Sequence, residues 1–91
     1  MKDPLDSRTK VVAANIRKVR EFRNYTQDYL AAKLGISQNA YSKIELGYSK
    51  LTLDRLFKVS MVMEIDPLKL LYFEKRDILD ILFPDEDTSS K

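Results

Sequence analysis

The chain contains no cysteine and no histidine. These absences exclude disulfide bonds, thiol nucleophiles, Cys/His zinc sites and imidazole acid–base catalysis. No apolar run approaches the roughly 18 residues that a membrane-spanning helix requires, and residues 1–10 lack the apolar stretch of a secretory signal. We therefore expect a cytoplasmic protein without metal, cofactor or membrane contact, and we expect no enzyme.

Glycine and proline are also scarce, with two glycines and three prolines among 91 residues. Apolar residues recur at helical spacing, and no long stretch alternates between apolar and polar residues. A chain of this length has room for one domain. The sequence therefore predicts a single compact all-α domain.

Five helices are predicted, over about residues 9–23, 26–33, 38–46, 53–63 and 67–73. Thr26, Ser37, Thr52 and Asp66 are the predicted N-caps, and Pro67 occupies the first turn of the last helix. Residues 1–8 are predicted to be a flexible arm and residues 84–91 an acidic tail. The inward residues expected on the fourth helix are Leu53, Leu56, Val59, Ser60 and Met63. Those expected on the fifth helix are Leu68, Leu71 and Tyr72.

The segment 74–83 is too apolar for a free tail. It can be a sixth short helix or a continuation of the fifth, and a strand stays open for so short a run. It either covers the small domain or forms a dimer interface. The candidate dimer residues are Leu70, Phe73, Ile78, Leu79, Leu82 and Phe83.

Charge is distributed unevenly. Residues 1–50 hold ten Lys and Arg against five Asp and Glu, whereas residues 51–91 hold six against nine. A basic half of this kind suggests that one face meets a polyanion, although charge alone also serves solubility.

The stretch 27–46, QDYLAAKLGISQNAYSKIEL, combines two short helices with a tight turn. Ala31 is the small residue needed where the helices cross, and Gly35 tolerates the positive φ of the turn. The inward apolar positions are Leu30, Leu34, Ile36, Tyr41 and Ile44. These seven positions fit the DNA-binding helix-turn-helix pattern, although a plain αα-hairpin would share some of them.

Residues from about 12 to 71 resemble the lambda-repressor/Cro-type helix-turn-helix family of bacterial and phage transcription regulators. The landmarks are IRKVREFRNYTQDYLAAKLGISQNAYSKIELGYSKLTLDRL and VMEIDPLKLL. The resemblance implies a compact five-helix lambda-repressor-like DNA-binding domain over residues 9–73. Tyr41 departs from the pattern, because an aliphatic residue often stands there.

The third predicted helix would enter the major groove with its N-terminal residues toward the base edges. The carboxamides of Gln38 and Asn39 each carry a hydrogen-bond donor and an acceptor. This pair matches N7 and N6 of adenine in the major groove. Ser42 and Lys43 lie one turn further on the same face, and Lys43 suits guanine or a phosphate. The alternative for all four is an ordinary solvated helix surface.

Phosphate contacts are expected from Gln27, which in the resembling family clamps a backbone phosphate at the start of the second helix. The other candidates on the flanks are Asn24, Thr26, Ser37, Tyr48, Ser49 and Lys50. Tyr48 is equally compatible with the edge of the core. The resemblance also implies a structural ion pair between Arg20 and Glu45.

The predicted function is a sequence-specific double-stranded DNA-binding transcriptional regulator, a repressor that binds a palindromic operator as a homodimer. The alternative is an antitoxin-type protein-interaction module with autoregulatory DNA binding, whose C-terminal segment contacts a protein partner.

Overall fold

The computed structural model describes residues 4–73 of the chain. The predictions for residues 74–91, including those for Ile78, Leu79, Leu82, Phe83 and the acidic tail, lie outside the described residues.

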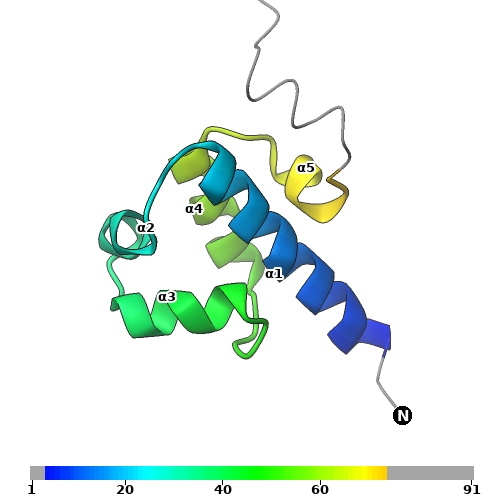
Figure 1. The fold of residues 1–91 in the computed structure, drawn as a ribbon. Coiled ribbons are helices and arrows are strands. Elements are labelled where there is room, and N and C mark those ends of the chain that lie inside the picture. Colours follow the sequence, from blue (N-terminus) through cyan, green and yellow to red (C-terminus); the bar gives the residue numbers. More distant parts are fainter. Residues whose placement is uncertain (1–3, 74–91) are drawn as a thin grey trace, which may run out of the picture.

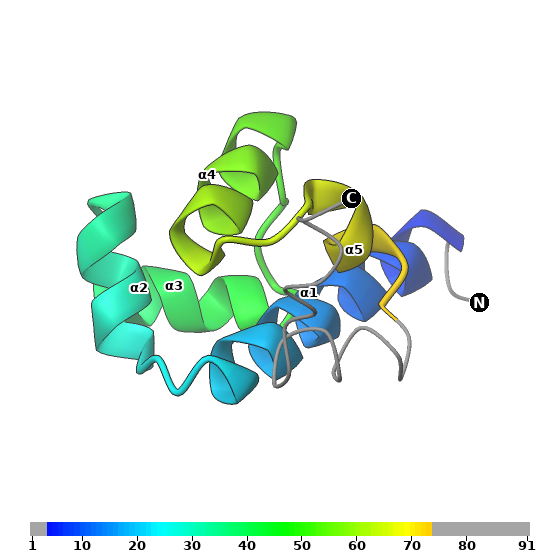
Figure 2. The same ribbon diagram turned by 90° about the horizontal axis from the view of Figure 1, so that it is seen from above.

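The described part consists of five α-helices without a strand: α1 (Pro4–Phe22), α2 (Gln27–Leu34), α3 (Gln38–Glu45), α4 (Leu53–Met63) and α5 (Pro67–Leu71). Figure 1 shows α1 running across the molecule, with α2 and α3 together at one side. Seen from above, α5 lies against α1, and α4 lies between α2 and α5 (Figure 2). The predicted all-α fold with five helices is confirmed.

Four helices begin at the predicted N-caps. The side chains of Thr26, Ser37 and Thr52 each accept a hydrogen bond from the backbone N–H three residues later, at 3.0, 3.0 and 3.1 Å. Asp66 accepts from the N–H of Leu68 at 2.9 Å, with Pro67 in the first turn. These caps satisfy backbone donors that have no partner inside a helix.

The first helix differs from its prediction. It begins at Pro4, so residues 4–8 belong to α1 and not to a flexible arm. Proline suits the first helical position because its φ is already helical and its missing N–H would have no partner there. The pair Asp3–Pro4 repeats the start signal of Asp66–Pro67, and this sequence signal was available.

The core lies between α1 and the other four helices. Its fully buried members include Ile16, Val19, Leu30, Tyr41 and Met63. The buried Asn15 side chain donates to the carbonyl oxygen of Leu70 at 2.8 Å and so joins α1 to α5. Arg23 donates to the carbonyl oxygens of Met63 and Glu64 at 3.0 and 2.9 Å, which satisfies the C-terminal end of α4.

Some inward positions were predicted wrongly. Leu53, Leu68 and Tyr72 are 67%, 65% and 71% exposed, whereas Leu70, predicted to serve a dimer interface, is fully buried in the core. Phe73, another dimer candidate, is half-buried and packs against the core. The five residues of α5 make less than one and a half turns, so their apolar pattern does not define which face turns inward.

Candidate nucleic-acid interface

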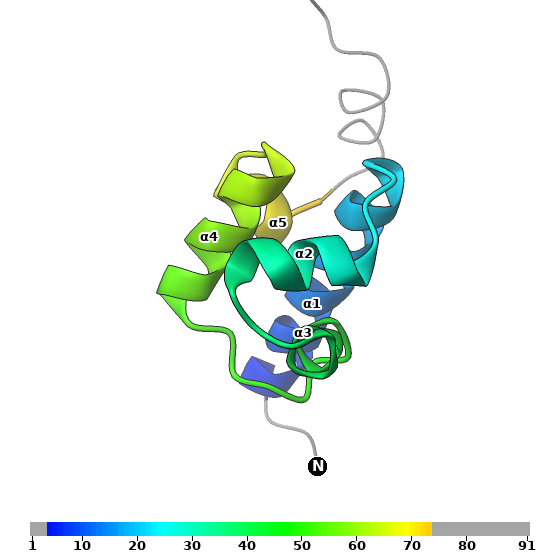
Figure 3. The ribbon, with the colours of Figure 1, turned by 90° about the vertical axis from the view of Figure 1, so that its left-hand side faces the viewer.

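The pair formed by α2 and α3 has the geometry of a helix-turn-helix (Figure 3). Leu30 and Ala31 of α2 are buried where the two helices pack. The chain turns at Gly35, whose φ of 72° lies in the left-handed region that favours glycine. The Ile36 N–H donates to the Ala31 carbonyl oxygen at 3.0 Å and closes the turn. The tight connection holds α3 at a defined angle to α2.

One side of α3 is buried and the other is exposed. Tyr41, Ile44 and Glu45 face the domain, with 0%, 6% and 7% of their surface exposed. The four predicted base-contact residues are on the outward side: Gln38, Asn39 and Lys43 are exposed, and Ser42 is half-buried. Among the described residues, the side chains of Gln38 and Asn39 have no hydrogen-bond partner. Their amides are available to a ligand at the N-terminal end of the helix.

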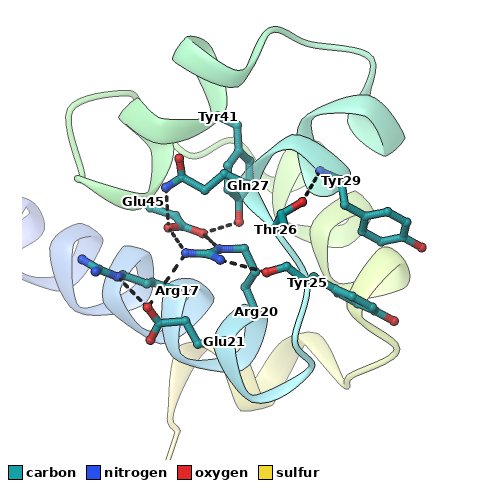
Figure 4. A network of polar contacts seen from close by, with 9 residues as sticks. All are labelled: Arg17, Arg20, Glu21, Tyr25, Thr26, Gln27, Tyr29, Tyr41 and Glu45. Carbon is teal, nitrogen blue, oxygen red and sulfur yellow. Dashed lines mark hydrogen bonds and ion pairs between the residues drawn. The ribbon is translucent and has the colours of Figure 1, made fainter.

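The predicted ion pair of Arg20 and Glu45 is present and belongs to a larger polar network (Figure 4). The Glu45 carboxylate, 2% exposed, accepts from Arg20 Nε at 2.6 Å and from Arg20 Nη2 at 3.2 Å. It also accepts from the Tyr41 hydroxyl at 2.5 Å and from Gln27 Nε2 at 3.1 Å. Arg20 Nη1 donates to the Tyr25 carbonyl oxygen at 2.9 Å. One carboxylate thus links α1, α2 and α3.

The network changes the ionisation of its members. The hydrogen bond to Glu45 raises the pKa of Arg20 above its usual value, and burial opposes this effect. Burial, followed by the hydrogen bond to Glu45, raises the pKa of Tyr41 far above its usual value. Tyr41 therefore remains a protonated hydrogen-bond donor at neutral pH, and its hydroxyl compensates part of the cost of burying the carboxylate.

The contact between Gln27 and Glu45 also orients the Gln27 amide. An ionised carboxylate only accepts hydrogen bonds, so the amide must present its NH2 group and not its oxygen to Glu45. Nε2 carries two hydrogens, and one of them satisfies Glu45. The second N–H remains for another acceptor at the start of α2, where the helix dipole also favours an anion.

The other predicted phosphate contacts lie on loops and helix ends. Asn24 is exposed, with φ at 61°, and ends the turn after α1. The oxygens of Thr26 and Ser37 already accept cap hydrogen bonds, although both residues are exposed. Tyr48 is 74% exposed, which excludes the alternative that it forms the edge of the core. Lys50 is exposed and Ser49 is half-buried.

A surface pocket of about 430 Å³ lies where the α3–α4 loop approaches α1. Its lining consists of Thr9, Lys10, Gly47, Tyr48, Ser49, Lys50 and Leu51. Gly47 has φ at 77°, and a Cβ there would lie 2.9 Å from Cγ of Lys10, so glycine allows the loop to approach α1. Two lysines and a serine at one pocket form a suitable surface for a phosphate group.

Two members of this site were not predicted from the sequence. The sequence places Lys10 in the first predicted helix and indicates no function for it. Its position beside Lys50 follows only from the close approach of Gly47 to α1. Tyr41 was predicted as an inward apolar residue, and the role of its hydroxyl depends on where Glu45 lies. The spacing of Tyr41 and Glu45, four residues apart, was the one available signal, because such pairs meet on a helix.

Comparison with known proteins agrees with this geometry. Residues 16–70 match the family model described as helix-turn-helix. No curated protein and no solved structure matches the chain at a significant level. Within residues 4–73 no helix is long and apolar enough to cross a membrane, and the same residues contain no acidic cluster that could hold a metal ion.

Proposed function

The chain belongs to the Cro/C1-type helix-turn-helix family and is a DNA-binding transcriptional regulator, and from this premise we propose that it reads a specific sequence with the N-terminal end of α3. In this proposal α3 enters the major groove, and Gln38 and Asn39 make hydrogen bonds to base edges. Ser42 and Lys43 contact bases or phosphates one turn further along the groove.

The observation that carries the proposal is the contrast between the two sides of α3. One side is buried and fixed by the Glu45 network, while the other presents two free amides at the helix end. A reading helix needs both properties, because base contacts discriminate only when the helix is held rigidly at one position.

Phosphate contacts on either side of α3 position it. At the start of α2, the second N–H of Gln27 donates to one phosphate. On the other side, the pocket of Lys10, Tyr48, Ser49 and Lys50 binds another. Asn24, Thr26 and Ser37 contribute from the adjoining turns. These contacts provide affinity and orientation without reading sequence.

We further propose that the protein is a repressor in the cytoplasm and binds a palindromic operator as a homodimer without catalysing a reaction. A single helix reads only a few base pairs, and two copies related by a two-fold axis double the sequence that is read. Occupation of the operator excludes other proteins from the same DNA.

Selection of bound oligonucleotides from a random duplex pool tests this function. We expect a preferred site made of two inverted half-sites with centres about 34–36 Å apart. Binding to the selected site should weaken steeply with salt, because Lys contacts release counterions from DNA. A pool that yields no preferred sequence, or binding that is independent of salt, would contradict the proposal.

A further inference from the structure

Helix α4 carries apolar side chains on two faces. Leu56, Val59 and Met63 are buried in the core. Leu53, Phe57 and Met61 follow one another at four-residue steps and are 67%, 48% and 75% exposed. Residues four apart lie on the same face of a helix, so these three form a continuous outer row. We call this row the α4 stripe.

The apolar surface extends beyond α4 itself. Leu53 also lines a surface pocket of about 290 Å³ between α1, α4 and α5, together with Val12, Leu71 and Tyr72. Single exposed apolar residues are common, but a row that continues into a pocket is typical of an interaction surface. The pocket is largely apolar, and its lining also includes Arg8, Thr9 and Thr52. A partner that binds the α4 stripe could therefore also contact the adjoining pocket.

The charges beside the α4 stripe are self-complementary. Asp54 and Lys58 lie on one side of the stripe, one turn apart, and pair at 3.3 Å with side chains 77% and 59% exposed. In an antiparallel arrangement of two identical helices, residues on the same side of the seam face each other. Each Asp54 would then face Lys58 of the second copy. An exposed ion pair contributes little to stability, so replacing the Asp54–Lys58 pair within one copy by the same pair between two copies costs little free energy.

We propose that the α4 stripe is the interface between two copies of this chain, with the α4 helices antiparallel and Phe57 near the two-fold axis. Such an interface is isologous, since the same patch serves both copies. This inference rests on the proposed function in one respect, because it assigns an interface to the proposed homodimer. The interface itself can be tested without DNA.

The position of α4 is compatible with DNA reading. In Figure 3 α4 lies at the side of the molecule and α3 lies near its lower edge. A second copy on the outer face of α4 leaves the N-terminal end of α3 uncovered.

The first experiment measures the oligomeric state of the full chain and its charge variants by sedimentation velocity at several concentrations. The wild type should show a monomer–dimer equilibrium. Asp54→Lys and Lys58→Asp should each raise the dimer Kd by at least about tenfold, because like charges then face each other. A mixture of the two variants should form a heterodimer, and the double variant D54K/K58D should dimerise like the wild type. A monomeric wild type, or a mixture that stays monomeric, would overturn the proposal.

The second experiment compares two apolar positions in the full chain. Phe57→Asp should give a monomer, whereas Leu79→Asp, in the segment predicted from sequence as a dimer element, should leave the dimer intact. Circular dichroism melting identifies a variant that has failed to fold, and the exposed charge variants then decide the question. A dimer that survives F57D but not L79D would place the interface in the C-terminal segment and overturn the proposal.

The two proposals fail in different ways. Monomeric variants should keep weak, salt-dependent binding to duplex DNA through a single α3. A protein that dimerises through the α4 stripe but binds no DNA would contradict the proposed function and leave this interface standing.

Discussion

The two ends of α3 differ in almost every physical respect. At the C-terminal end, the buried Glu45 accepts four hydrogen bonds from three side chains. At the N-terminal end, Gln38 and Asn39 are exposed and have no partner among the described residues. One end of an eight-residue helix therefore holds it in place, and the other is available for binding. Substitutions at the two ends should separate stability from affinity.

The largest expected effect is on stability, at Glu45. Glu45→Ala leaves the Arg20 guanidinium, 12% exposed, without its carboxylate. Breaking such a buried pair from one side costs about 3–5 kcal/mol of the free energy of unfolding, measurable by urea denaturation. Glu21→Ala is the control, because the half-exposed Glu21 carboxylate pairs with Arg17 at 3.1 Å and lies only at the limit of an ion pair with Arg20, at 4.0 Å. Its loss should cost less than about 1 kcal/mol. Equal losses in both variants would refute the structural role of the network.

Removing the Tyr41 hydroxyl should have the next largest effect. Tyr41→Phe keeps the buried ring but takes one donor from Glu45, which should cost about 1.5–3 kcal/mol of unfolding free energy. Tyr48→Phe, at a residue 74% exposed, should change the stability by less than about 0.5 kcal/mol.

The raised pKa of Tyr41 adds a dependence on pH. In the unfolded chain this phenol ionises near pH 10, whereas in the folded protein it stays protonated well above that pH. Its stabilising contribution is therefore complete below about pH 10 and is lost as the pH rises further. The wild type should lose stability above about pH 10 more steeply than Tyr41→Phe. Parallel curves for the two proteins would show that Tyr41 ionises normally when folded.

The N-terminal end should show the reverse behaviour. Gln38→Ala should weaken binding to the selected operator by about 1–3 kcal/mol while leaving non-specific binding and the free energy of unfolding nearly unchanged. Titration of labelled operator and of a scrambled duplex provides the comparison. An equal loss on both duplexes would exclude direct reading by Gln38.

The smallest expected effect is at the pocket beside the α3–α4 loop. Lys10→Ala should weaken binding to all duplexes alike and reduce the slope of log Kd against log salt by about 0.9, the value for one phosphate. Lys33→Ala, on α2 over the Tyr29 ring, is the control with an unchanged slope. A slope that Lys10→Ala leaves unchanged would remove this pocket from the interface.

The sequence predicted the parts of the fold that depend on local chemistry. The caps Thr26, Ser37, Thr52 and Asp66, and the positive φ at Gly35, follow from side chains acting on their own backbone. The burial of Leu30, Tyr41 and Ile44 follows from helical spacing.

Most features that depend on tertiary packing were not predicted, and the exception is the Arg20–Glu45 pair that the family resemblance implied. The α4 residue Leu53 is exposed although Leu51 and Leu56 on either side of it pack in or against the core, and the short α5 left its inward face undefined. The α1 start at Pro4 was missed although its signal was local. For the candidate site, the outward residues of α3 were predicted, but Lys10 and the contacts of Gln27 and Tyr41 with Glu45 require the helices to be placed relative to one another.

The most direct test of the central claim is nuclear magnetic resonance of the nitrogen-15-labelled protein titrated with operator duplex. The account predicts that the largest shifts occur at the backbone and side-chain amides of Gln38 and Asn39, followed by the Gln27 side-chain amide. Signals of Tyr41 and Glu45 should move little, because the network stays intact. Shifts concentrated on α4 or α5, with Gln38 and Asn39 unmoved, would contradict the account.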